Sequence, residues 1–359
     1  MTTFHLHPGM WRDCDHVLVT HDELSATLFT YASGVLAVRL RNAHGEIVLL
    51  PYQGQQIWSA TIDGRSLGMQ SMFDEPQPTT TYLHTYGGFF VHCGATRMGV
   101  PGPTDTHPLH GELPNARYQQ AWLTIGTDDH GTYIALSGSF RYTVAFQDNY
   151  VATPEVRFYA NRRVWSVSMT IANQKKTAMD LMYLAHINYR PVDHAVLQTT
   201  APSTAEAIRV RRSIPSHITP APGYREFIAE LATNPTVATT LTPGLGFDPE
   251  VVFTIDAIAD EQGWAHSMQR LPDGTADYVA HRPDQLPYVI RWISRTPDQD
   301  CLGFAMPSTA EPEGYTAEKA KGNLRSIAGQ HTWRCDFVVG VLDTHKAAEL
   351  GDFLATLTA

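Results

Sequence analysis

Two histidines and a glutamate lie close together in residues 107–116, which read His-Pro-Leu-His-Gly-Glu-Leu-Pro-Asn-Ala. His107 and His110 are three residues apart, and Glu112 follows two residues after the second histidine. The two prolines disfavour a helix and a central strand, so the stretch is predicted to be a loop. Because imidazoles titrate near neutral pH and loops often carry functional groups, this loop is a candidate site. The competing interpretation is a surface loop that holds histidine by chance, since the chain has 17 histidines.

A second candidate site residue, His186, stands near the end of the apolar run 181–187. Asn188, Tyr189 and Arg190 follow it, and a proline comes next. A histidine that emerges at the end of a buried strand is held in a defined place, which favours a functional role. The alternative is a core histidine whose ring nitrogens bind backbone groups.

The composition is that of a folded chain with a well-filled core, because 43% of its 359 residues are hydrophobic and 17% are charged. The net charge is −10 and the longest basic block is Arg211-Arg212, so nucleic acid is not expected as a partner. No apolar run approaches the roughly 18 residues of a membrane-spanning helix, and no export signal is visible. The four cysteines form no CxxC pair, which favours reduced thiols. A cytoplasmic protein without a membrane partner is expected.

Short β-type segments separated by turn residues dominate the chain. They are predicted at 36–40, 46–50, 56–62, 117–125, 132–137, 140–147, 155–159, 163–172, 179–187, 250–255, 263–270, 276–281, 287–293, 301–306 and 332–342. Apolar residues occupy the odd positions from 165 to 171, which places one face of that strand on a core. The turn at 173–176 is expected to close a hairpin between 163–172 and 179–187.

Helical signals are few. Short helices are predicted at 224–231 and 346–354, and the Thr-, Ser- and Pro-rich segment 198–223 is expected to be a long excursion. Neither an internal repeat nor a linker is visible. The predicted fold class is therefore all-β, with a single large antiparallel β-sandwich domain over residues 1–359.

Together, the two histidine stretches resemble those of the galactose mutarotase-like (aldose 1-epimerase) superfamily, and most closely a divergent branch of it. His110-Gly111 matches the family's His-Gly pair in a loop after the early strands. His186-Ile187-Asn188-Tyr189 matches the second family histidine, which ends a strand shortly before an aromatic residue. Asn173 fits the turn before that strand, and Asp248 loosely matches a later aspartate segment. The resemblance implies a many-stranded antiparallel sandwich with its site in a cleft on one sheet.

The resemblance also implies an activity, which is the interconversion of sugar anomers by two proton transfers without a metal or another cofactor. It gives His186 as the acid on the ring oxygen and His110 as the group that orients or polarises the substrate. The residues expected to hold sugar hydroxyls are Arg97, His107, Glu112, Asn188, Arg190 and Asp248. The partner is then a small sugar or sugar derivative, and the protein is expected to be a monomer or a homodimer.

One position departs from the family pattern. The family's general base is a glutamate on a late strand, and Ala305 stands where that glutamate is expected. Carboxylates follow soon after, so Glu311 is the first candidate for the base, with Glu313 and Glu112 behind it. The competing interpretation of Glu311 and Glu313 is a solvated loop rich in proline and glycine.

Three alternative functions stay open at this point. The first is a carbohydrate-binding protein that kept the cleft and lost the base, which the alanine at 305 favours. The second is a different sugar epimerase or isomerase that uses His110, His186 and Glu112 for enolisation next to a carbonyl. The third is a metal site formed by His107, His110 and Glu112, although a loop broken by proline lacks the fixed geometry of a helical HExxH motif.

Overall fold

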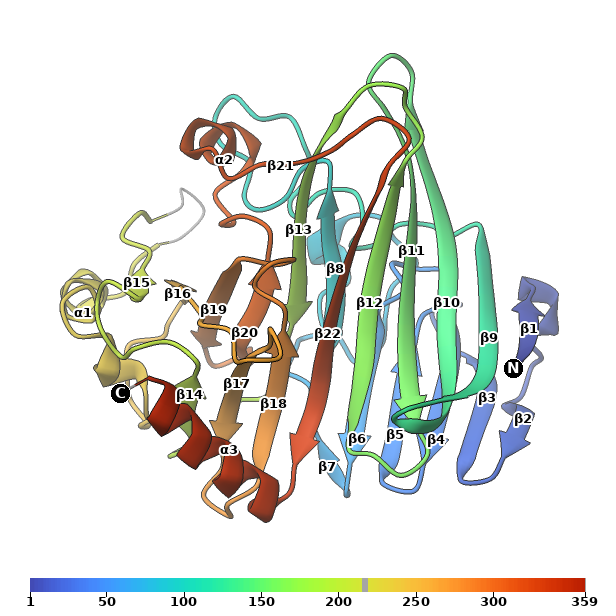
Figure 1. Cartoon of the computed structure of the whole chain (residues 1–359), viewed down its shortest axis with the longest axis horizontal. Coiled ribbons are helices and arrows are strands. Elements are labelled where there is room, and N and C mark those ends of the chain that lie inside the picture. Colours follow the sequence, from blue (N-terminus) through green and yellow to red (C-terminus); the bar gives the residue numbers. More distant parts are fainter. Residues whose placement is uncertain (215–218, 359) are drawn as a thin grey trace.

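Two large antiparallel sheets face each other and make up most of the molecule (Figure 1). The computed structural model describes residues 1–214 and 219–358. The nine-stranded sheet has the order β1 (Thr2–Leu6), β9 (Gln120–Asp128), β10 (Gly131–Val144), β11 (Asp148–Tyr159), β12 (Val164–Asn173), β22 (Thr332–Leu342), β18 (Ala276–His281), β17 (Ala265–Arg270) and β14 (Val196–Thr199). The all-β sandwich that the strand pattern predicts is confirmed.

The second sheet has thirteen strands and carries the candidate site. Its main row has the order β15 (Ile208–Val210), β16 (Val251–Ile255), β19 (Tyr288–Arg295), β20 (Asp300–Ser308), β13 (Met179–Ile187), β8 (Phe90–Ala95), β6 (Ile57–Ile62), β5 (Gly45–Leu49), β4 (Leu36–Asn42), β3 (Leu24–Thr30) and β2 (His16–His21). Two short strands lie off this row, because β7 (Arg65–Ser66) pairs with β6 and β21 (Arg325–Ile327) pairs with β13.

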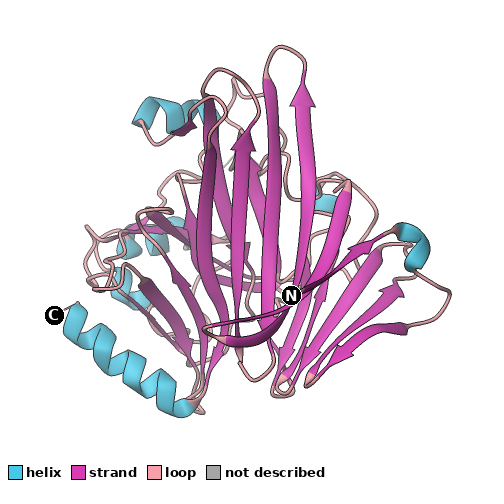
Figure 2. Cartoon of the chain, turned by 45° about the vertical axis from the view of Figure 1, so that its right-hand side comes forward, coloured by secondary structure: helices cyan, strands magenta, loops and turns pink. Residues whose placement is uncertain are grey.

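The helices lie at the periphery of the molecule (Figure 2), and α3 packs against the nine-stranded sheet. They are α1 (Tyr224–Leu231), α2 (Tyr315–Lys321) and α3 (Thr344–Leu357), with short 3₁₀ turns at Pro8–Met10, Tyr82–His84 and Pro235–Ala238. The predicted helix 224–231 is confirmed, and the C-terminal helix is longer than predicted. Its start is set by Asp343, whose carboxylate accepts a hydrogen bond from the Lys346 backbone nitrogen at 3.0 Å. The sequence pattern does not predict α2, which follows a loop rich in proline and glycine.

The main core lies between the sheets and draws apolar side chains from both of them. Trp165, Val167, Met169 and Ile171 are buried in it, so the alternation predicted for that strand is confirmed. A smaller apolar cluster lies on the other face of the thirteen-stranded sheet. We call it the site-face cluster, and its buried members are Val91, Cys93, Met98, Met182, Leu184, Val252, Ile290, Met306 and Ala310.

The predicted hairpin at 173–176 is wrong. β12 pairs with β11 and β22 in the nine-stranded sheet. β13 belongs to the thirteen-stranded sheet, where it pairs with β8, β20 and β21. The turn therefore crosses between sheets, and Asn173 stabilises the crossing by donating from its side-chain amide to Thr177 and Ile327 carbonyls, each at 2.9 Å. The segments predicted at 132–137 and 140–147 form the single strand β10.

The long excursion expected at 198–223 is met only in part by the described residues. The segment 198–223 contains β15 and the end of β14, and its residues 215–218 lie outside the described residues. All four cysteines carry free thiols, as expected. In the described part of the chain, no helix combines the length and the apolar character needed to cross a membrane.

Candidate functional site

His186 reaches the site face because side chains alternate along β13. Its neighbours Ala185 and Ile187 point into the main core, whereas Met182 and Leu184 belong to the site-face cluster. His186 stands on the same face as these two residues and is 5% exposed. A buried apolar strand thus carries a polar ring to a face that is otherwise apolar.

His110 is held by backbone hydrogen bonds between its loop and the end of β8. The His110 nitrogen donates to the Gly99 carbonyl at 3.0 Å, and the His110 carbonyl accepts from the Gly94 nitrogen at 2.9 Å. His110 has a φ of 59° and Gly111 has a φ of 83°. A Cβ atom at position 111 would lie 2.1 Å from the Arg97 carbonyl oxygen and 2.5 Å from that of Gly94. The glycine after the histidine is therefore required by a close backbone approach as well as by its positive φ.

Replacing Gly111 with alanine is expected to lower the free energy of unfolding by about 1–3 kcal/mol and to displace His110, because the new methyl group meets two carbonyl oxygens. Gly34→Ala is the matched control, since Gly34 has a φ of 87° and a methyl group there would meet no atom within 4 Å. Urea unfolding of both variants measures the difference. A Gly111→Ala protein as stable as Gly34→Ala would contradict the assigned close approach.

The two candidate histidines meet although they are far apart in the sequence. Their ring centroids are 5.4 Å apart and the ring planes are at 89°. This confirms the proximity expected from the two motifs, and the binding of one sugar by both rings stays a prediction. Their roles in catalysis stay predictions.

Three aromatic side chains enclose the imidazole pair. Tyr82 packs on His110 with centroids 5.0 Å apart, and Tyr86 and Trp292 pack on His186 at 6.0 and 5.5 Å. Both tyrosines belong to the segment between β7 and β8, and the motifs gave no signal for them. Aromatic faces suit the apolar faces of a sugar ring.

Tyr82 is expected to act as a cover over the pair. Replacing Tyr82 with alanine should make His110 react with diethyl pyrocarbonate, whereas the ring should be protected in the parent protein by burial. Leu83→Ala is the control, because Leu83 is 59% exposed in the same turn. Mass spectrometry of the modified peptides measures the effect. Equal modification of His110 in the parent and in Tyr82→Ala would show that Tyr82 does not cover the ring.

Burial keeps both imidazoles neutral at neutral pH. It lowers the pKa of His186 to about 4, and a hydrogen bond to Asn188 opposes this shift. The pKa of His110 is lowered well below its usual range, first by burial and then by the nearby His186 and His107. A neutral imidazole offers one N–H donor and one lone-pair acceptor, which is the equipment for proton transfer in either direction.

Two buried polar atoms beside the pair have no hydrogen-bond partner within the described ranges. They are His110 Nδ1 and the Tyr82 hydroxyl. A buried polar atom without a partner costs about 1–3 kcal/mol, so such atoms call for an explanation. The hydroxyl groups of a bound ligand would satisfy both.

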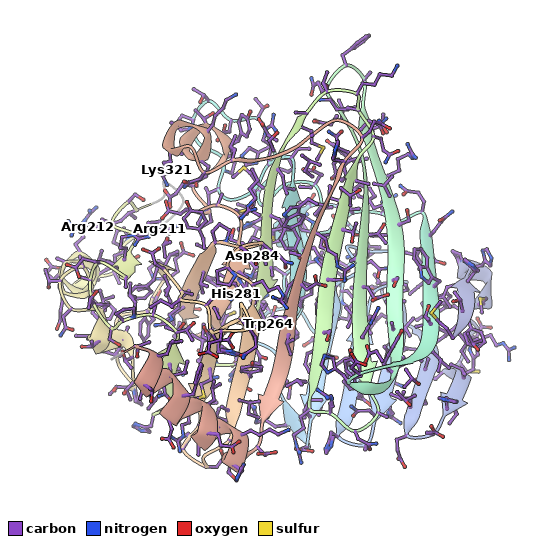
Figure 3. The ribbon with its side chains drawn as sticks, in the orientation of Figure 1. Arg211, Arg212, Trp264, His281, Asp284 and Lys321 are labelled. Atoms are coloured by element: carbon purple, nitrogen blue, oxygen red, sulfur yellow. The ribbon has the colours of Figure 1, made fainter. Side chains whose placement is uncertain are left out.

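Glu250 brings a carboxylate to the same face, and the sequence motifs did not single it out. It immediately precedes β16, and Val252, two residues on, belongs to the site-face cluster. One carboxylate oxygen accepts from Trp292 Nε1 at 2.7 Å, and the other accepts from Arg211 at 2.5 Å. Arg211 lies next to β15 (Figure 3). The available signal was its position directly before an apolar strand, two residues after the aspartate that the resemblance suggested.

Several residues expected to bind substrate are occupied by other contacts. The Arg97 guanidinium lies 3.6 Å from the centroid of Tyr315 on α2. Glu112 accepts from the Thr96 nitrogen at 2.9 Å and from the Tyr150 hydroxyl at 2.8 Å. His107 donates from Nδ1 to the Pro108 carbonyl at 2.8 Å. The contacts of Glu112 and His107 hold the loop 107–116 in place, and the loop in turn positions His110.

The remaining expected site residues lie in other contacts or at the surface. Arg190 is half-exposed and pairs with Asp300 at 3.5 Å. Asp248 is exposed. Glu311, the expected base, pairs with Lys321 at 2.6 Å, and Lys321 lies on α2 (Figure 3). None of the hydrogen bonds found among the described residues joins these three side chains to the imidazole pair.

On β20, the residue at the position expected for the family's glutamate points away from the candidate site. Ala305 is 1% exposed and packs in the main core, on the face of β20 away from the imidazoles. Met306 belongs to the site-face cluster, which Trp292 contacts. A methionine therefore stands on the site side of this strand.

The metal-site alternative gains no support from the geometry. Glu112 binds Tyr150, His107 binds a backbone carbonyl and His110 faces His186. Across residues 1–214 and 219–358, no group of three or more His, Cys, Asp or Glu side chains is placed to hold a metal ion.

The fold is that of the galactose mutarotase-like proteins. A “putative aldose 1-epimerase” from Klebsiella pneumoniae subsp. pneumoniae MGH 78578 matches 100% of this chain with 96% of its own, at a TM-score of 0.83 and 17% identity. A galactose mutarotase-like protein from Clostridium acetobutylicum matches 90% of this chain with 100% of its own, at a TM-score of 0.60 and 10% identity. The predicted resemblance is confirmed at the level of the fold, and the low identities place the chain on a divergent branch.

The chain belongs to the family described as Domain of unknown function (DUF4432), whose model matches residues 32–341. No curated protein matches the sequence.

Proposed function

We propose that this protein is a carbohydrate isomerase that interconverts sugar anomers by acid–base catalysis at His186 and the Tyr82 hydroxyl, with His110, which contacts both, orienting the substrate. The observation that carries the proposal is the pair of neutral imidazoles, 5.4 Å apart, where His110 Nδ1 and the neighbouring Tyr82 hydroxyl find no hydrogen-bond partner among the described residues. Their enclosure by Tyr82, Tyr86 and Trp292 supports a sugar as the ligand, because aromatic rings pack on its C–H faces.

The chemistry needs one group that accepts a proton and one that donates a proton. The acceptor takes the proton of the anomeric hydroxyl while the donor protonates the ring oxygen, and the C1–O5 bond breaks. Rotation about the C1–C2 bond and ring closure then give the other anomer, with both protons returned. Positioned acids and bases of this kind accelerate such steps by about 10²–10⁴.

Support differs among the side chains that would assist. Glu250, which accepts hydrogen bonds from Trp292 and Arg211, is a candidate for binding sugar hydroxyls on the far side of Trp292 from His186. Glu311 is a weaker candidate for the base, since Lys321 already holds its carboxylate. We therefore assign proton transfer to His186 and the Tyr82 hydroxyl, and orientation of the substrate to His110.

The test is anomer exchange measured by NMR saturation transfer over a panel of aldoses, uronates and sugar phosphates. The proposal predicts that the protein accelerates exchange for at least one of them. Binding without acceleration across the panel would favour a carbohydrate-binding protein. A ketose or a C2-inverted product would favour a different isomerisation, in which Glu112 is the next carboxylate to replace.

A further inference from the structure

The Asn188 side chain is fully buried directly after β13, two residues from His186. Its amide nitrogen donates to the Gly88 carbonyl at 2.8 Å. This contact sets the direction of the amide, because the opposite orientation would place the side-chain oxygen against a carbonyl oxygen. The Asn188 oxygen therefore faces His186.

Three groups that can donate converge on this oxygen. His186 Nδ1 lies 2.8 Å away, the Tyr86 hydroxyl 3.4 Å and the Cys301 thiol 3.6 Å. An amide oxygen only accepts hydrogen bonds, so the short contact requires a hydrogen on His186 Nδ1. In a neutral ring that hydrogen is the only one on nitrogen, which leaves Nε2 with a lone pair.

Before substrate binds, the groups that face His186 among the described residues provide no charge that would stabilise an imidazolium, so the resting ring is neutral. His110 is neutral for the same reason as His186. Burial raises the pKa of the Tyr86 hydroxyl and of the Cys301 thiol well above their usual ranges, so both stay protonated. Glu250 lies behind Trp292 and is neutralised by Arg211.

We infer that Asn188 is a positioning residue that fixes His186 in its Nδ1-protonated tautomer, so that His186 accepts the proton of the anomeric hydroxyl at Nε2. This inference rests on the proposed function for its catalytic consequence, and it reverses the acid role that the resemblance implies for His186. It also supplies the base that Ala305 leaves missing.

The step balances without any further reactant. The O1–H bond breaks, Nε2 takes the proton, and the freed electron pair forms the C1=O1 double bond. The electron pair of the C1–O5 bond passes to O5, which takes a proton from the Tyr82 hydroxyl, the buried donor beside His110. Ring closure on the other face of C1 returns both protons.

The first experiment detects the tautomer directly and does not depend on activity. In protein labelled with ¹⁵N-histidine, long-range ¹H–¹⁵N spectra identify which nitrogen of His186 carries hydrogen, with His186→Gln assigning the signals by difference. The inference predicts protonated Nδ1 and unprotonated Nε2 between pH 5 and 8. A hydrogen on Nε2, in either the other tautomer or an imidazolium, would overturn it.

Two variants of Asn188 separate positioning from packing. Asn188→Asp loses the donor to the Gly88 carbonyl but keeps an acceptor for His186, so in folded protein the Nδ1-protonated tautomer should persist, and the added carboxylate should raise the pKa of His186. Asn188→Ala removes the acceptor and should release the tautomer preference. Cys301→Ala, which removes only a more distant donor, should leave the His186 nitrogen signals unchanged. If Asn188→Ala does not fold, loss of the tautomer in Asn188→Asp would still contradict the inference.

The second experiment measures the consequence with a sugar that the parent protein converts. Asn188→Ala should lower kcat about 10²-fold with little change in KM, and Asn188→Asp should retain most of the rate. A base works when it is unprotonated, so the rate of the parent protein should stay level above pH 5. In Asn188→Asp, the raised pKa of His186 should shift the rise of the rate to higher pH. A rate that falls as pH rises from 5 to 7 would show that His186 acts as an acid, even if the proposed activity is confirmed.

Discussion

Replacing His186 with glutamine is expected to lower the rate of anomer conversion by about 10²-fold or more, the usual effect of removing a positioned proton-transfer group. His110→Gln should be comparably costly, because the two rings meet edge to face at 5.4 Å in one enclosure. Steady-state rates from polarimetry, with the sugar selected from the panel, measure both effects.

His84→Gln is the matched control for these two variants. His84 is an exposed histidine in the same turn as Tyr82, and its replacement should leave the rate unchanged. Melting temperatures of all three variants separate unfolding from a loss of chemistry. Folded His186→Gln protein with full activity would exclude the imidazole pair as the reacting groups.

Acid conditions are expected to destabilise the protein strongly, because several buried histidines stay neutral in the folded state. Burial lowers the pKa of His92 and of His281 to about 3, and that of His186 to about 4. In the unfolded chain, a histidine titrates near 6.5. The unfolded state therefore binds more protons below that pH, and stability is lost as pH falls.

At pH 5, each of these histidines should lower the free energy of unfolding by about 2 kcal/mol relative to neutral pH. The three together should lower it by about 6 kcal/mol. This loss is a large part of the free energy of unfolding of an ordinary domain, which is about 5–15 kcal/mol. Urea unfolding at pH 5 and pH 7 measures the difference, and His281→Gln should reduce it by about 2 kcal/mol. Equal unfolding free energies at the two pH values would show that these rings are not held neutral by burial.

The fold could be predicted because its signals are local. Strand periodicity and turn residues placed most strands of the central and C-terminal parts correctly, and Trp165 to Ile171 entered the core as their alternation requires. The turn at 173–176 was misread because a tight turn between strands has the same local pattern whether the chain returns to the same sheet or crosses to the other. Only the long-range pairing of β12 with β22 and of β13 with β8 decides this.

The sequence predicted the two histidines of the candidate site but not the aromatic side chains around them. His110 and His186 carry short motifs, whereas Tyr82, Tyr86 and Trp292 are ordinary aromatic residues whose positions depend on how a loop and a distant strand pack. The role of Asn188 was also invisible in the sequence. Its oxygen faces His186 only because its nitrogen meets the Gly88 carbonyl, a contact across 100 positions.

The measurement that tests the central claim most directly is a crystal structure of the protein soaked with the sugar whose anomers it exchanges fastest. The proposed mechanism predicts the sugar between the imidazoles and the aromatic rings, with the anomeric oxygen about 3 Å from His186 Nε2. It also predicts that His110 Nδ1 and the Tyr82 hydroxyl gain sugar oxygens as partners. A sugar bound elsewhere, with the imidazole pair still closed beneath Tyr82 and Tyr86, would contradict the mechanism.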